Sequence, residues 1–194
     1  MSSKFYEYII IGPPGVGKTS IMLRYTDNVF LKKIYNTTGI ELKNKIIETP
    51  FGKSQVAIWD TAGQERYGAI TNNFLRYGNC IFLCFSLASK QSYYDCKKYV
   101  EIIKTHAKEN AVVYLVGTFL DMKDSCLNID IDEIKKFAKE NNYKYYEVSS
   151  QTGEGIKQLF DSSMFLMDQL NLNEKRFYQS IQEFVPKSSK CCNN

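Results

Sequence analysis

The stretch Gly12-Pro13-Pro14-Gly15-Val16-Gly17-Lys18-Thr19, GPPGVGKT, fits the pattern G-x-x-x-x-G-K-[ST]. It follows the apolar run YEYIIIG and opens the helical segment GKTSIMLRYTD, which is the context that a phosphate-binding loop needs. Backbone N–H groups from Gly15 to Thr19 would surround a phosphate, and the positive end of the following helix would attract it. Proline has no N–H to donate, but both prolines precede these donors. The loop therefore keeps its phosphate-binding groups.

Two side chains of this stretch have predicted roles. Lys18 would reach the β- and γ-phosphates of a nucleotide, and the hydroxyl of Thr19 would bind Mg²⁺. The predicted phosphate-binding residues are Gly15, Val16, Gly17, Lys18, Thr19 and Ser20.

Short apolar runs alternate with longer segments of helical period along the chain. We expect strands at residues 6–12, 40–48, 54–60, 80–86, 111–117 and 143–149, and helices at 17–27, 92–107, 130–140 and 155–170. This order predicts an α/β fold with a six-stranded, mostly parallel sheet, one antiparallel strand, and helices on both faces. Ligands bind such a sheet where loops leave the carboxyl ends of its strands.

Composition narrows the class of protein. The chain has 194 residues and a net charge of +4, and its basic residues are spread along the sequence, so we expect no nucleic-acid partner. No run approaches the roughly 18 apolar residues of a membrane span, and no signal peptide is visible, which predicts a cytosolic protein. The six cysteines form neither a disulfide framework nor a zinc pattern.

A second polar segment, Asp60-Thr61-Ala62-Gly63-Gln64-Glu65-Arg66, follows the strand-like run VAIW. Asp60 at the end of a strand is suited to hold a magnesium-bound water, and Gly63 could offer its N–H to a γ-phosphate. Together, WDTAGQERY and GPPGVGKT resemble the Ras-superfamily small GTPases, specifically those of the Rab type. The resemblance covers about residues 5 to 170, and it implies the small G-domain form of the P-loop NTPase fold.

The resemblance implies further roles. Gln64 would orient the attacking water, so that Gln64, Lys18 and Gly63 form the catalytic set. Thr37, in YNTTGIEL, would close over Mg²⁺ when a γ-phosphate is present, and Phe30 would lie against the base. The implied cofactors are Mg²⁺ and GTP or GDP. The protein would be a switch in which two loops stay ordered while γ-phosphate and Mg²⁺ offer them bonds.

The guanine-reading motif departs from the family pattern. Small GTPases usually have N-K-x-D after the fifth strand, whereas this chain has Thr118-Phe119-Leu120-Asp121. The retained Asp121 would accept hydrogen bonds from guanine, but Thr118 is too short to replace all the bonds of an asparagine. The later S-A-K motif corresponds to Ser149-Ser150-Gln151, which keeps a backbone N–H for the guanine O6. Guanine preference with weakened retention is expected; the alternative is that TFLD is an ordinary loop.

The end of the sequence, Cys191-Cys192-Asn193-Asn194, resembles the terminus on which Rab-type proteins carry two geranylgeranyl groups. One lipid gives marginal attachment and two give stable anchoring. We therefore expect a G domain over residues 1–170 and a flexible, prenylated tail over 171–194. The protein would occupy the cytosol and the cytoplasmic face of intracellular membranes.

The favoured hypothesis is a slowly hydrolysing, monomeric Rab-like GTPase of membrane trafficking. Its expected partners are an exchange factor, an activating protein, a GDP-dissociation inhibitor and effectors, which would bind through residues 40–42 and the segment after Gln64. A second hypothesis is a pseudo-GTPase, a membrane-tethered binding module locked in one state by its altered base site. A third, an ATPase or kinase using the same loop, leaves WDTAGQERY and the cysteine pair unexplained.

Overall fold

The computed structural model describes residues 4–34, 37, 39–49, 52–61, 73–122 and 130–184. Six strands form one sheet in the order β2-β3-β1-β4-β5-β6. Only the β2–β3 pair is antiparallel among the strand pairs of this sheet, which confirms the predicted α/β fold. The strands are β1 (Phe5–Ile11), β2 (Ile40–Thr49), β3 (Gly52–Thr61), β4 (Cys80–Ser86), β5 (Val112–Thr118) and β6 (Lys144–Glu147).

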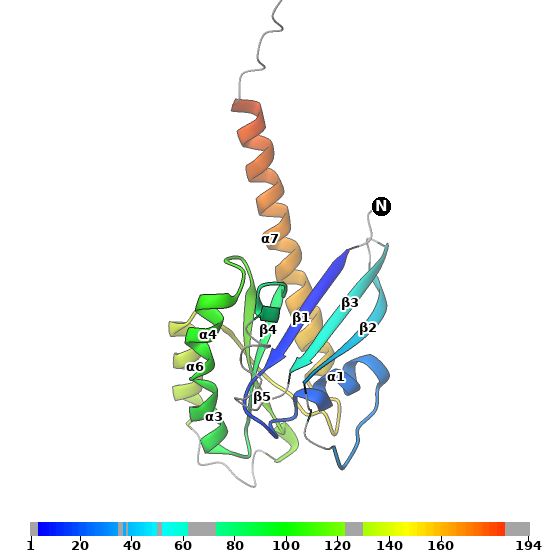
Figure 1. Ribbon diagram of the computed structural model, residues 1–194, viewed down its shortest axis with the longest axis vertical. Helices are drawn as coiled ribbons and strands as arrows, with labels where there is room; N and C mark the ends of the chain where they lie inside the picture. Colours follow the sequence, from blue (N-terminus) through cyan, green and yellow to red (C-terminus); the bar gives the residue numbers. More distant parts are fainter. Residues whose placement is uncertain are drawn as a thin grey trace, which may run out of the picture.

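Helices cover both faces of the sheet (Figure 1). The helical elements are α1 (Lys18–Asp27), α3 (Lys90–Cys96), α4 (Tyr99–His106), the 3-10 helix η2 (Leu120–Met122), α6 (Ile131–Glu140) and α7 (Ile156–Phe184). Alternate residues of β1 belong to two separate cores, because successive side chains of a strand point to opposite faces. Tyr8 and Ile10 pack on the side of α1 and α7, and Ile9 and Ile11 on the side of α3, α4 and α6.

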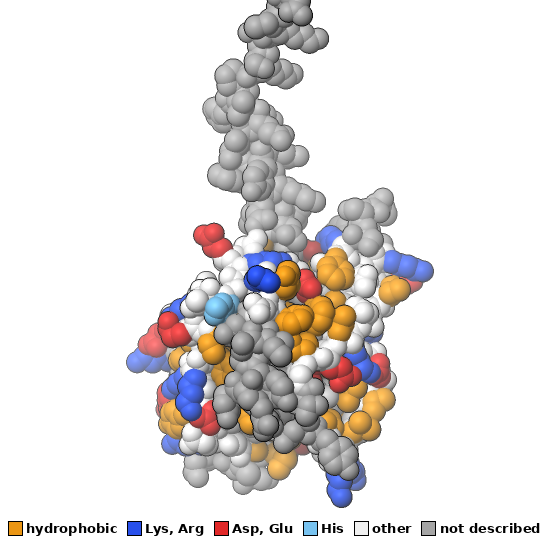
Figure 2. Space-filling view, viewed as in Figure 1, with side chains coloured by type: hydrophobic (Ala, Val, Ile, Leu, Met, Phe, Trp, Pro, Cys, Tyr) orange, Lys and Arg blue, Asp and Glu red, His pale blue; other side chains and the backbone are white. Residues whose placement is uncertain are grey.

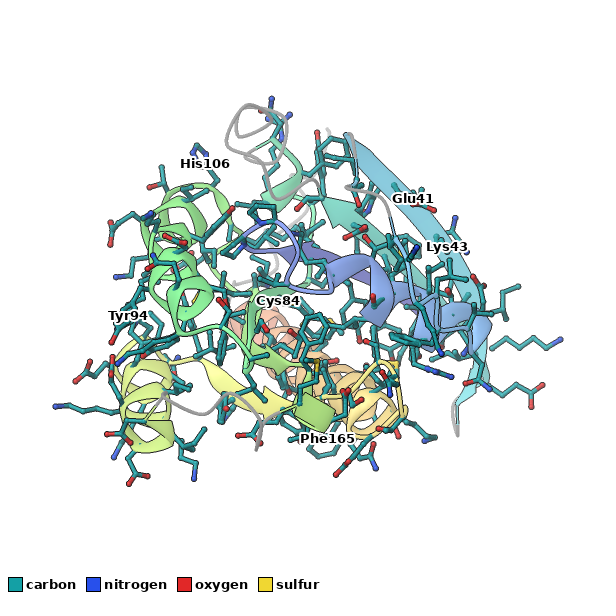
Figure 3. All side chains as sticks on the ribbon, turned by 90° about the horizontal axis from the view of Figure 1, so that it is seen from below. Glu41, Lys43, Cys84, Tyr94, His106 and Phe165 are labelled. Atoms are coloured by element: carbon teal, nitrogen blue, oxygen red, sulfur yellow. The ribbon has the colours of Figure 1, made fainter. Side chains whose placement is uncertain are left out.

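The central position of β4 explains its composition. All seven residues of CIFLCFS are buried, because this strand pairs with β1 and β5 and has helices over both of its faces. Its carboxyl end therefore gives the loop after β1 a rigid support. Figure 3 labels Cys84 of this strand near the middle of the molecule.

The antiparallel hairpin of β2 and β3 puts β2 at the edge of the sheet. The register of β2 with β3 runs from the Ile40–Thr61 pair to the Thr49–Gly52 pair. Glu41 and Lys43 of β2 lie at the outer edge of the molecule in Figure 3. The hairpin thus connects this exposed edge to Asp60 and Thr61, near the carboxyl end of β1.

The helix predicted over residues 92–107 is divided into two. Ser89 caps α3 by accepting a hydrogen bond from the N–H of Ser92, so that α3 begins at Lys90. It ends at Cys96, and α4 begins at Tyr99. Lys97, between the helices, binds Glu133 of α6 at 2.9 Å. The prediction of one continuous helix is wrong, because at the break the N–H groups of Lys98 and Val100 bond to carbonyls three residues back, those of Asp95 and Lys97, in place of α-helical bonds.

The last helix is longer than predicted. It continues to Phe184, so residues 171–184, expected as the start of a flexible tail, are helical, and the predicted end near Leu170 is wrong. The apolar period fades after Leu170, but the following residues contain no proline or glycine that would end a helix. This end of α7 projects from the fold at the opposite end from the carboxyl ends of β1 and β3 (Figure 1).

The surface agrees with the mild net charge of the chain. Basic and acidic side chains of the described residues are interspersed on the face shown in Figure 2. Within the described ranges, no helix combines the length and the apolar character needed to cross a bilayer.

Candidate functional site

Two adjoining cavities lie where loops leave the carboxyl ends of the parallel strands. A cavity of about 220 Å³ follows the loop after β1 and reaches Thr19, Thr37 and Thr61. A second, of about 360 Å³, is lined by Asp121, Ser150 and Gln151, among others. Both cavities share Gly17, Ser20, Phe30, Lys32 and Phe119. They thus form one elongated site with a loop-and-helix end and an aromatic end.

The first cavity is built for an anion. Gly17 is the N-cap of α1, with φ of 84° and no side-chain capping bond. The N–H groups in the first turn of the helix therefore remain available to a ligand, and no acidic residue lies there to compete with it. Gly15, Gly17, Lys18 and Thr19 line the cavity, in agreement with a phosphate cradle formed beyond both prolines, and Pro14 lines it as well.

Lys18 is buried beside this loop, only 6% exposed. Its Nζ donates to the carbonyl oxygens of Gly12, at 2.9 Å, and Pro13, at 2.8 Å. These bonds hold the ammonium group at the cavity. Burial lowers the pKa of Lys18, while the nearby Asp60 carboxylate opposes that shift.

Three side chains from distant parts of the sequence meet at the end of the cavity. The Oγ1 of Thr19 donates to Oδ2 of Asp60 at 2.5 Å and lies 2.9 Å from Oγ1 of Thr37. Thr37 also donates to the same carboxylate oxygen at 3.4 Å. Thr19 comes from α1, Thr37 from the chain before β2, and Asp60 from the end of β3. The structure therefore brings together all three of the predicted magnesium ligands.

The donor set fits Mg²⁺, a hard cation that prefers oxygen ligands and usually binds one or two carboxylates together with phosphates and water. Asp60 is fully buried, and within the described residues its Oδ1 has no hydrogen-bond partner. Burial raises the pKa of Asp60 to about 6, and the bond from Thr19 partly offsets this. A cation or its bound water would satisfy the free oxygen. Among the described residues, no cluster of three His, Cys, Asp or Glu offers an all-protein metal cage.

The second cavity has aromatic walls and a carboxylate. Phe30 and Phe119 both line it, as expected for a site that holds a flat base. The exposed Asp121 accepts a hydrogen bond from Oγ of Ser149 at 2.5 Å. The Oγ of Ser149 in turn accepts a hydrogen bond from the N–H of Thr152 at 3.1 Å. Ser149 thus supports the carboxylate from within the protein rather than lining the cavity.

Thr118 lies at the edge of this cavity, but its hydroxyl faces the protein. The Oγ1 lies 2.7 Å from the carbonyl oxygen of Val16 and 2.9 Å from that of Phe85. A hydroxyl has one hydrogen to share between these acceptors. Thr118 therefore fastens the phosphate loop to β4, and its hydrogen is not free to read a base. The side chain of Val16 is likewise part of the core.

Phe119 has an unusual backbone conformation, with φ of 57°. This left-handed region is strained for a bulky residue, at a cost of about 1 kcal/mol or more. Its ring lies against Gly17, where an added Cβ would be 3.4 Å from the ring. The conformation places an aromatic wall over the phosphate loop at the junction of the two cavities.

Some of the predicted residues cannot be placed. Gly63, Gln64, Cys191 and Cys192 lie outside the described residues. Sequence reasoning also missed residues that line the first cavity, namely Leu31, Lys32, Ile34 and Thr61. Thr61 could have been found from its place beside Asp60 at the end of a strand. The other three lie in an irregular segment that carries no local signal.

The site as a whole suits a nucleotide with a chain of phosphates. A cationic loop and a helix N-terminus adjoin an oxygen-rich position for a divalent cation, and an aromatic cavity with one carboxylate lies next to them. A carboxylate that accepts two hydrogen bonds favours guanine, which has adjacent N–H donors on its ring and its amino group.

Comparison with known proteins agrees with this geometry. The sequence model of the Ras family matches residues 7–169. The chain is 36% identical to Ras-related protein Rab-15 of Homo sapiens, over 80% of this chain and 73% of the relative. It is 32% identical to Ras-related protein RabQ of Dictyostelium discoideum, over 99% of this chain and 100% of the relative. The chain belongs to the Ras family and is a Rab-type small GTPase, which binds GTP and GDP with Mg²⁺ and hydrolyses GTP.

Proposed function

We propose that this GTPase is a switch read through the segment around Thr37 and through the segment that contains Gln64. Gly15 to Ser20 would bind the phosphates, with Lys18 on the β- and γ-phosphates. Thr19 and Thr37 would bind Mg²⁺ directly, and Asp60 would bind it through water. Gly63 would donate its N–H to the γ-phosphate, and Gln64 would orient the attacking water.

The observation that carries this proposal is the meeting of Thr37 with Thr19 and Asp60. Thr37 itself belongs to no strand or helix, and its hydroxyl bonds to the two groups that would share the cation with it. With a γ-phosphate and Mg²⁺ present, its hydroxyl has a cation to bind; after hydrolysis that attraction weakens. Residues 40–42 begin three positions after Thr37, and Glu41 and Leu42 are exposed, so effectors could bind there and respond to this change.

For the base, the support is Phe30 and Phe119 as walls and Asp121 with its Ser149 support. Ser150 and Gln151 would supply backbone N–H groups for the guanine O6. Because Thr118 offers no free hydrogen, we propose guanine selection with fewer base contacts than the family's usual motif allows. Each missing hydrogen bond would cost about 1 to 3 kcal/mol.

The proposed setting is an intracellular membrane. Cys191 and Cys192 would each carry a geranylgeranyl group, and the chain would act as a monomer with an exchange factor, an activating protein and a GDP-dissociation inhibitor. The projecting end of α7 lies opposite the nucleotide site, which would leave the site facing away from the membrane (Figure 1). The intact mass of the chain recovered from eukaryotic cells tests this attachment, since a chain without added lipid would contradict it.

Turnover tests the switch. The nucleotide on the freshly purified protein is identified, and single-turnover GTP hydrolysis is followed in the wild type and in Gln64→Leu. We expect bound guanine nucleotide and slow hydrolysis that falls about 10-fold or more in the variant, because leucine cannot orient a water. Gln169→Leu is the control for the same substitution away from the site, because Gln169 is an exposed residue of α7 that lines neither cavity, and its hydrolysis of GTP should be unchanged.

Other outcomes would point elsewhere. No turnover and an empty site would favour the membrane-tethered binding module locked in one state. Bound ADP or ATP would contradict guanine selection. Equal turnover in the wild type and in Gln64→Leu would contradict the role of Gln64.

A further inference from the structure

Arg24 links the helix that begins at the phosphate site to the loop that borders the base cavity. It lies on α1, which begins at Lys18 and Thr19. Its Nε donates to the carbonyl oxygen of Ser150 at 2.7 Å, and its Nη2 donates to that of Gln151 at 2.9 Å. Ser150 and Gln151 both line the second cavity. One side chain therefore joins two parts of the site that are 126 residues apart in sequence.

The same guanidinium is fixed at its other side. Nη1 of Arg24 lies 3.2 Å from both the carbonyl oxygen and Oδ1 of Asn28, which is the left-handed C-cap of α1. A guanidinium is planar and holds its N–H donors in a fixed fork, so contacts on both sides determine its orientation. The fork presents two well-aimed donors to the loop.

These donors determine how the loop's peptide groups are turned. The main-chain hydrogen bonds of the described residues give the carbonyls of Ser150 and Gln151 no N–H partner, so Arg24 is the group that holds them. Their peptide bonds are trans, and a planar trans peptide directs its C=O and N–H to opposite sides. With the Ser150 carbonyl turned toward Arg24, the N–H of Gln151 points away from Arg24.

The neighbouring peptide is held in another way. The N–H of Gly153 donates to the carbonyl of Ser149 at 2.9 Å, and this sets the direction of the Ser150 N–H. The loop thus has two N–H groups with directions set separately, one by its own turn and one by Arg24. Guanine has an acceptor at O6 for such donors, whereas adenine has an amino group there.

We propose that Arg24 is a positioning residue for guanine: it holds the loop of Ser150 and Gln151 so that its N–H groups meet the O6 of the base, and it thereby slows nucleotide release. The inference rests on the proposed base site. It predicts an effect on guanine nucleotides in particular, because adenine nucleotides gain nothing from an N–H aimed at O6.

The test measures the dissociation rate of a fluorescent GDP and the affinities of GDP and ADP, by competition, in Arg24→Ala, Arg24→Lys and the wild type. Arg76→Ala is the matched control, since Arg76 is an exposed arginine that stacks on Tyr77, remote in sequence from the base loop. We expect GDP to dissociate about 10-fold faster or more from Arg24→Ala, with ADP affinity unchanged. Arg24→Lys keeps the charge but loses the fork and would be intermediate, and Arg76→Ala would match the wild type.

Two results for Arg24→Ala would overturn the inference. One is GDP dissociation within about twofold of the wild-type rate. The other is an equal fall in GDP and ADP affinity, which would show that Arg24 only stabilises α1. A wild type that binds GDP and ADP equally would overturn the proposed guanine site itself, and the inference with it.

Discussion

Replacing Lys18 by methionine is expected to lower the affinity for GTP and GDP by about 100-fold or more. The ammonium group is held at the cavity by the carbonyls of Gly12 and Pro13, in position to donate to phosphate oxygens. A charge-assisted hydrogen bond contributes about 1.5 to 3 kcal/mol, so the one N–H that the two carbonyls leave for the nucleotide accounts for a loss of this size. The measurement is the equilibrium affinity for a fluorescent GDP in excess Mg²⁺.

Methionine keeps most of the apolar stem of Lys18, so folding need not fail together with binding. The urea midpoint without added nucleotide checks this for each protein. Lys98→Met is the control, because the side chain of Lys98 is 77% exposed and bonds to Asp95 on the surface. An affinity for GDP within about fivefold of the wild-type value in a folded Lys18→Met protein would contradict the assigned role.

A methyl group at Gly12 is expected to destabilise the fold by about 3 kcal/mol or more. An added Cβ would lie 2.2 Å from the carbonyl oxygen of Cys84, and φ of 140° is itself unfavourable for alanine. β4 cannot yield easily, since it is a central strand buried on both faces. Gly12→Ala should therefore show a much lower free energy of unfolding in urea, measured with saturating GDP.

Gly39→Ala is the control that measures the cost of a positive φ without the steric clash that Gly12→Ala makes with Cys84. Gly39 also has a positive φ, of 97°, but an added Cβ there would meet no atom within 4 Å among the described residues. We expect it to cost about 1 kcal/mol, the usual penalty for a side chain in this region of φ. If Gly12→Ala cost no more than Gly39→Ala, the close approach of Cys84 would not be what requires glycine at position 12.

Local patterns predicted the parts of the site that are contiguous in sequence. The loop from Gly12 to Thr19 has the residue spacing of a phosphate-binding loop, and CIFLCFS is apolar enough to indicate a strand buried on both faces. The meeting of Thr19, Thr37 and Asp60 was also predicted, but it required resemblance to a family as well as the chemistry of the residues.

Other features depend on contacts that no short segment encodes. The break between α3 and α4 coincides with the bond from Lys97 to Glu133. In the sequence alone, Arg24 is indistinguishable from any polar residue of an amphipathic helix, because its bonding partners Ser150 and Gln151 lie far along the chain. Thr118 looked like a weakened base contact, and only the fold shows its hydroxyl on Val16 and Phe85.

The central claim is that a terminal phosphate, acting with Mg²⁺, determines where Thr37 lies. Crystal structures of the protein with Mg²⁺ and either GDP or a non-hydrolysable GTP analogue test it directly. We predict that Oγ1 of Thr37 lies about 2.1 Å from Mg²⁺ in the triphosphate complex and has left the cation in the diphosphate complex. The same position of Thr37 in both complexes would contradict the account.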